Sequence, residues 1–287
     1  MKRTGLFIYL LLFCLACGAK QITIIPKYTV GDTLRYRMTS KVILYHGKDS
    51  LVTLTSFLPE VFVEDRNDKG FILSTSNRLE SNSVECSDPG FKKLLPLDNE
   101  ELNAIVEGMK LRIQLDAAYR PDSILNLQEV KESLANAYLE LARKTGDANP
   151  AEDAEWEIDT EFLIGRLVNE ICTLPHIIDE QFGNIPYFSF AGIPLKSGKI
   201  PASMALTDEL QLLCGIEELK MTVCETGEEG DGFYSIDLKG KKRKSNVDGS
   251  LLYADGILCH GYLEATIKSD SEEFIIFCCI DEIPDSE

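Results

Sequence analysis

The chain has 287 residues, 44% of them hydrophobic, which suffices for one large core or two modest ones. Its 47 acidic residues outweigh 29 basic residues and give a formal net charge of −18. So acidic a chain repels phosphate backbones and anionic headgroups, which argues against nucleic acid as a partner and against membrane contact without a lipid anchor.

The N-terminus has the anatomy of a secretory signal peptide. Lys2 and Arg3 precede an uncharged apolar run at residues 5–16. This run is shorter than the ~20 residues that span a bilayer, and small residues follow it. We therefore predict that residues 1–19 are a signal peptide, that the mature chain has no transmembrane span, and that the protein is exported and periplasmic or outer-membrane-associated.

Two cleavage sites fit this segment. Cleavage after Ala19 would release a soluble chain. Alternatively, residues 15–18 resemble the lipobox of bacterial lipoproteins, which makes Cys17 a candidate lipidation site, although Cys14 stands where that motif prefers leucine. Because no acidic cluster follows Cys17, an anchored form would face the periplasm.

The first block after the signal peptide predicts antiparallel strands. Residues 32–50, 51–70 and 71–84 are rich in strand-forming residues, and turn sequences at residues 46–49 and 67–70 separate them. Pro59 indicates a bulge or an edge within the second stretch. This pattern is typical of a meander and not of βαβ units.

Helical patterns occupy the middle of the chain. Residues 98–109 predict a short helix, and residues 110–125 return to strand and turn. The clearest helix starts after Asn126 as the predicted N-cap, and Gly146 is predicted to end it. Another helix is expected from Pro150, and residues 160–173 predict a further one that Pro175 breaks or kinks.

From Tyr187 onward the sequence again predicts strands, and residues 274–280 are apolar on both faces, as in a central strand covered on each side. The strands–helix–strand–helices–strands order predicts an α+β fold. We expect an extended, curved antiparallel sheet system with two or three helices packed on its concave side. Residues 20–287 are expected to form a single domain, with a division near residues 183–186 as the alternative.

Seven cysteines follow the signal peptide, and their odd number leaves at least one thiol unpaired within the chain. Cys278 and Cys279 are adjacent in a predicted strand, so they should point to opposite faces and not bond each other. Burial as small hydrophobic residues is the expected role of most of the seven.

No constellation in the sequence selects a catalytic or metal site. Pro175 disrupts the Cys172-x-x-x-His176 spacing, and no second pair of ligands accompanies it. Cys259 and His260 are neighbours on a predicted strand and therefore cannot form a dyad; His260 is expected to share a face with Leu258. We accordingly predict a non-enzymatic protein without cofactor or metal.

One basic run stands out in this acidic chain. It contains Lys241, Lys242, Arg243 and Lys244. A charged hairpin tip that protects a sheet edge is one interpretation. The other is a contact for an anionic partner, such as lipid A phosphates or an acidic polysaccharide.

Short motifs resemble those of bacterial envelope proteins. Thr33, Ser50 and Ser123 each follow an aspartate and precede an aliphatic residue, like the O-glycosylation pattern of Bacteroidetes-type secreted proteins, although ordinary turn chemistry explains each site too. The stretches "KYTVGDTLRYRMTSK" and "PDSILNLQEVKESLANAYLELARK" are similar to segments of uncharacterised secreted or lipoprotein families of Bacteroidetes-type bacteria. The outline is also similar to periplasmic lipoprotein carriers, whose open sheet cups a lipid.

These observations predict a non-catalytic cell-envelope protein. The first hypothesis is binding of a lipid or other apolar ligand in a pocket beneath the helix at residues 127–145. The second is a structural or interaction protein with an envelope partner, which uses sheet edges and the basic run. The third is a carboxylate-dependent hydrolase, which requires two acids in one cleft.

Overall fold

The computed structural model describes residues 21–87, 103, 105, 107, 109–148, 160–226, 232–268 and 272–284. The side chains of residues 144–148, 179, 180 and 226 lie outside this description. Predictions for residues 1–20, including Cys17, and for the helix start at Pro150 also fall outside it.

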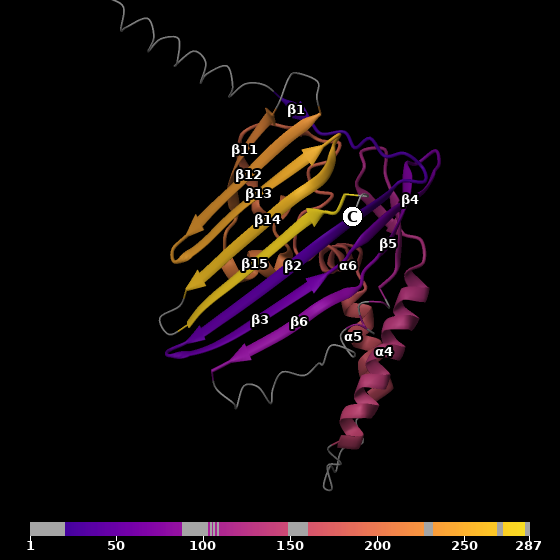
Figure 1. Cartoon of the computed structure of the whole chain (residues 1–287), viewed down its shortest axis with the longest axis vertical. Coiled ribbons are helices and arrows are strands. Elements are labelled where there is room, and N and C mark those ends of the chain that lie inside the picture. The colour runs from indigo at the N-terminus through magenta and orange to yellow at the C-terminus, as the bar shows by residue number, and fades with distance from the viewer. Residues whose placement is uncertain are drawn as a thin grey trace, which may run out of the picture.

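The fold is α+β and mainly β (Figure 1). The strands are β1 (Ile22–Thr23), β2 (Thr33–His46), β3 (Asp49–Phe57), β4 (Glu60–Arg66), β5 (Phe71–Ser76), β6 (Leu79–Cys86), β7 (Leu111–Leu115), β8 (Pro121–Ile124), β9 (Pro194–Leu195), β10 (Gly198–Pro201), β11 (Glu218–Thr226), β12 (Phe233–Lys242), β13 (Ser245–Ala254), β14 (Ile257–Lys268) and β15 (Glu272–Glu282). The helices are α4 (Leu127–Ala148), α5 (Thr160–Ile171), α6 (Leu174–Gln181), η1 (Ala202–Met204) and α7 (Asp208–Cys214).

One open antiparallel sheet of 13 strands organises the molecule. Its order is β10-β11-β12-β13-β14-β15-β2-β4-β5-β7-β8, and β3 and β6 extend it beside the second half of β2. The break at Leu58 and Pro59 explains this branching, since β3 and β4 both pair with the same edge of β2 on either side of it. The predicted antiparallel strands, both turns and the disruption at Pro59 are confirmed. The predicted meander is wrong, because β4 pairs with β2 instead of β3, and β6 pairs with β3 instead of β5.

The sheet buries one face and leaves the other open. Side chains that point inward, such as Met38 on β2 and Cys278 and Ile280 on β15, are at most 1% exposed. No described element covers the opposite face, which Figure 1 shows from the front. We call these the inner and outer faces. The strand at residues 274–280 is central, as predicted, but the expectation that both its faces are covered is wrong for the described residues.

An irregular aromatic segment packs on the inner face. At residues 182–193 the sequence predicted strand from Tyr187, but the chain forms turns there instead. The rings of Phe182 and Tyr187 stack at 4.2 Å, and Phe188 packs edge-on against both. Gly183 adopts a left-handed φ of 57° directly over Met38, where a Cβ would collide with the sulfur. Close ring packing thus replaces the ladder that an added strand would have formed.

Two features of α4 differ from the predicted helix. The side chain of Asn126 does not cap it: its Oδ1 accepts from the Arg112 N–H at 2.8 Å and its Nδ2 donates to the Lys110 carbonyl at 2.9 Å. The start of β7 therefore engages the side-chain oxygen that would accept from a helix N–H in a cap. The helix also continues past Gly146 to Ala148, because a single glycine weakens a helix without stopping it.

The placement of α4 differs from the expected one. Figure 1 shows α4 and α5 side by side, displaced laterally from β11–β15 and extending past the β6 end of the sheet. Four α-helices occur in the described residues, and α7 is the one that contacts β13 and β14. Because α4 does not overlie β11–β15, the concave-side arrangement expected for it differs from the one observed, and a pocket beneath residues 127–145 stays a prediction. The break between α5 and α6, with Pro175 in the first turn of α6, is confirmed.

Candidate ligand groove

The basic run forms the tip of the β12–β13 hairpin. Lys242 ends β12, Ser245 starts β13, and Arg243 takes the left-handed φ of 54° that so tight a turn needs. The hairpin is confirmed, but β12 and β13 are flanked by β11 and β14. The tip therefore does not protect a sheet edge.

A groove of about 490 Å³ lies beneath this tip. Its basic side chains are Lys242, Arg243, Lys244 and Lys268. Its apolar side consists of Leu212, Leu213, Cys214 and Ile267. Cations and aliphatic groups thus meet in one concavity, an arrangement that is complementary to an anionic amphiphile.

The short helix α7 supplies the apolar side. Thr207 caps it by accepting from the Leu210 N–H at 3.3 Å, and Gly215 ends it with a left-handed φ of 62°. Leu210 and Cys214 face the core, which turns Leu212 and Leu213 outward with 84% and 51% exposure. The packing of the helix therefore determines that two leucines face the groove.

The cations around the groove are exposed. Lys242 Nζ lies 2.5 Å from Glu217, and Lys268 Nζ lies 2.8 Å from Glu273. Arg243 has no ion-pair partner in the part of the chain that the structure describes. Since exposed ion pairs contribute little, an anionic ligand can exchange with these carboxylates at small cost.

An apolar row continues from the groove across the inner face. Ile267 pairs with Phe274, Phe274 with Leu44, and Leu44 with Leu51, so the four side chains share one face of adjacent strands. Each is half-buried, in contrast to the buried Leu263 and Cys278 further along the same strands. The described residues therefore leave an apolar track that starts at the groove.

A second groove, of about 480 Å³, carries the acids. Glu170, Asp208, Glu209 and His176 are among its lining residues. The Glu209 carboxylate lies 3.4 Å from His176 Nδ1, and the side chains of Glu170 and Glu209 are 68% and 65% exposed. Carboxylates so well hydrated lack the dry surroundings typical of acid–base catalysis. Cys172 is buried beneath this region, and no described metal-ligand cluster includes it or His176.

His260 lies where the sequence did not place it. A bulge in β14 pairs Leu252 with His260 but Tyr253 with Leu258, so Cys259 is the extra residue. The bulge puts Leu258 on the inner face and His260 on the outer face; the prediction that the two share a face is wrong. Cys259 and His260 form no dyad, as predicted.

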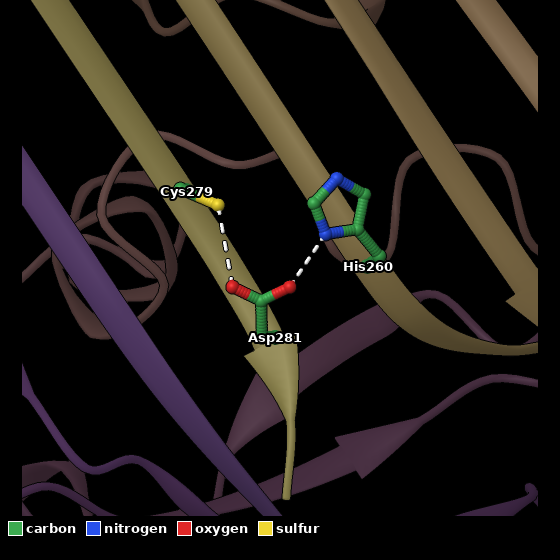
Figure 2. A group of neighbouring side chains, drawn as sticks. All are labelled: His260, Cys279 and Asp281. Atoms are coloured by element: carbon green, nitrogen blue, oxygen red, sulfur yellow. Dashed lines mark hydrogen bonds and ion pairs between the residues drawn. The ribbon is translucent and has the colours of Figure 1, made fainter.

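On the outer face His260 meets two residues of β15 (Figure 2). His260 Nδ1 lies 2.6 Å from Asp281 Oδ1, and Cys279 Sγ donates to Asp281 Oδ2 at 3.4 Å. Burial, and secondly the Asp281 charge, raise the pKa of Cys279 to about 12. Because the carboxylate stands between the thiol and the imidazole, this trio is not arranged as an activated nucleophile. Sequence analysis missed it; the Cys279-x-Asp281 spacing on one strand face was the available signal.

The other predicted sites are dispersed. Thr33 and Ser50 lie at the starts of β2 and β3, and Ser123 lies in β8, each half-buried. None of the seven described cysteines forms a disulfide, and Cys278 and Cys279 point to opposite faces as predicted. Cys172, Cys214 and Cys278 are buried, whereas the other four are not.

The described helices include none that is long and apolar enough to cross a membrane.

No family model and no curated protein matches the sequence. Among solved structures, one titled for lipid–protein interactions in lipovitellin aligns with 90% of this chain and 26% of its own, at 9% identity and a TM-score of 0.47. An outer membrane channel from Pseudomonas putida F1 aligns with 90% of this chain and 97% of its own, at 9% identity and a TM-score of 0.22. At these scores neither likeness carries an argument about this chain.

Proposed function

We propose that this is a non-catalytic cell-envelope protein that binds an anionic amphiphile, its headgroup at the β12–β13 tip and its apolar chain against α7. The observation that carries the proposal is the meeting of exposed leucines and cations in one groove. The export signal at residues 1–19 and the resemblance to Bacteroidetes-type envelope proteins support the location.

Charge complementarity selects an anionic headgroup. The chain as a whole repels anions, with a net charge of −18, but four cations gather around this groove. A phosphate-bearing headgroup is therefore attracted at this place and repelled over most of the surface. Arg243 presents a planar fork of donors suited to phosphate oxygens.

The apolar chain of the ligand has a defined place. Fully burying a leucine side chain contributes about 1.5–3 kcal/mol, and Leu212 is 84% exposed without ligand. From Ile267 the apolar row offers the chain a continuation across the inner face. Both halves of an amphiphile thus gain contacts.

The test is co-sedimentation of the protein with phosphatidylglycerol vesicles, compared with phosphatidylcholine vesicles. We expect binding to the anionic vesicles and little to the neutral ones. The double variant R243Q/K244Q should weaken binding about 30-fold, since a basic residue near an anionic surface contributes about 1 kcal/mol. Leu212→Ser should also weaken binding while leaving stability unchanged, because the side chain is already solvated.

The matched control is K69Q/K196Q, which removes the same charge from residues that do not line the groove. It should bind as the unmodified protein does. An equal loss in both double variants would mean that only total charge matters. That result, or equal binding to both kinds of vesicle, contradicts the proposal.

A further inference from the structure

We propose that His260, Cys279 and Asp281 bind a divalent transition-metal ion of the zinc class on the outer face of the sheet. The site is independent of the proposed ligand groove, which lies under the hairpin tip. It also departs from the expectation, drawn from the sequence, that the chain holds no metal.

The sheet brings the three ligands together. His260 and Asp281 are direct cross-strand partners of β14 and β15, and Cys279 precedes Asp281 by two residues and so shares its face. One nitrogen, one sulfur and one oxygen lie within 4.8 Å of one another (Figure 2). Because paired strands hold all three backbones, the ligand set is largely preformed.

The distances suit a tetrahedral ion after a small adjustment. With zinc bond lengths of about 2.1 Å to N and O and about 2.3 Å to S, tetrahedral N and O ligands stand about 3.4 Å apart and S and O about 3.6 Å. In the structure His260 Nδ1 lies 2.6 Å from Asp281 Oδ1, and Cys279 Sγ lies 3.4 Å from the other carboxylate oxygen, Oδ2. One oxygen of Asp281 lies within 4.8 Å of both other ligand atoms. Rotations of the three side chains would bring the nitrogen, the sulfur and one carboxylate oxygen to these separations.

The surroundings leave the site negative and open. Arg37 of β2 stands opposite Asp281 of β15 in the strand register. Its guanidinium, however, donates two hydrogen bonds of 3.1 Å to the carboxylate of Glu80. The side chains of His260 and Asp281 are 38% and 58% exposed, so an ion can enter and keep water as its fourth ligand. Imidazole and thiolate ligands favour zinc-class ions over Mg²⁺ and Ca²⁺, which prefer oxygen ligands.

The test uses Co²⁺ as a spectroscopic probe on the purified full chain with its thiols reduced. We expect one Co²⁺ per chain, a near-ultraviolet thiolate-to-cobalt charge-transfer band, and displacement by Zn²⁺ but not by Mg²⁺. Cys279→Ser should abolish the band. Cys224→Ser, which changes an exposed thiol on the same face in β11, should retain it.

Asp281→Asn provides a second variant, because its exposed side chain can change without disturbing the core. It should lower the Zn²⁺ affinity at least tenfold in calorimetry, with an unchanged circular dichroism spectrum. Absence of a charge-transfer band in the unmodified protein overturns the proposal. The proposal is also overturned if Cys224→Ser loses the band while Cys279→Ser retains it.

Discussion

At the residue scale, a pair of buried phenols links the aromatic segment to the sheet. The hydroxyls of Tyr36 on β2 and Tyr187 lie 2.8 Å apart, and their rings meet edge-on with centroids 5.7 Å apart. Burial is the main cause that raises the pKa of each well above its ordinary value. Each phenol satisfies the other where water cannot reach.

This pair predicts loss of stability in alkali. Because the folded pKa of each tyrosine exceeds the unfolded value of about 10, their stabilising contribution is complete below pH 10. It is lost as the pH rises from 10 toward the folded pKa. Buried thiols such as Cys278, whose pKa burial also raises, begin the decline earlier. Urea unfolding from pH 7 to 11 should show the free energy of unfolding falling ever more steeply.

Tyr36→Phe should make that decline shallower and cost roughly 0.5–1.5 kcal/mol at pH 7, because the Tyr187 hydroxyl loses one hydrogen bond and keeps the one to Tyr28. Tyr45→Phe is the control, since Tyr45 is 41% exposed. A decline as steep in Tyr36→Phe as in the unmodified protein would show that other groups cause it.

At the element scale, α4 and α5 form a hairpin that buries a narrow stripe. Val130 and Leu134 of α4 and Ile164 and Val168 of α5 are at most 9% exposed. Lys131 adds a 2.8 Å hydrogen bond to Asn169 across the pair. The opposite surfaces remain exposed, so stability of the hairpin depends on few side chains.

Leu134→Ala should therefore lower the free energy of unfolding by about 2–5 kcal/mol, through lost burial and the cavity left behind. Leu163→Ala on α5 is the control: its side chain is 49% exposed, so the change should stay within about 0.5 kcal/mol. The midpoints of urea unfolding measure the change in stability of both variants. Similar values for the two variants would mean that the hairpin contributes little to the stable core.

At the scale of the whole molecule, the pairing of β2 with β15 joins the two ends of the chain at the centre of the sheet. Their register runs without interruption from Tyr36 opposite Glu282 to His46 opposite Glu272. β14 and β3 flank this pair, so its amides are bonded on both sides. Pairing β2 with β15 closes a loop that contains nearly all of the described chain, which costs conformational entropy. Once formed, the pair ties the core strands into one cooperative unit.

Hydrogen exchange should be slowest in β2 and β15 and faster in β6 and β10, each of which has one strand neighbour among the described residues. Exchange followed by mass spectrometry measures this order. Equal rates in β2 and β6 would contradict the central role of the β2–β15 pair.

Local signals predicted the elements that depend on neighbours in the chain. The three strand-rich stretches at residues 32–84, the turns at residues 46–49 and 67–70, and the break at Pro175 follow from alternation, turn residues and proline chemistry. The separation of residues 71–84 into β5 and β6 was not predicted. The aromatic segment at residues 182–193 and the capping role of Asn126 were mispredicted. In both cases contacts with another part of the chain replace the local structure: the aromatic rings pack against one another and against β2, and the Asn126 side chain binds the backbone at the start of β7.

The candidate sites likewise contain features that local sequence signals predicted and features that depend on distant contacts. By itself the sequence determined the basic hairpin, the extended antiparallel sheet and the opposed faces of Cys278 and Cys279, because period and turn chemistry are local. Only the tertiary structure placed Leu212 and Leu213 beside that hairpin, and His260 beside Asp281. Those contacts depend on helix orientation, strand register and one bulge, which are set by burial of side chains from the whole chain.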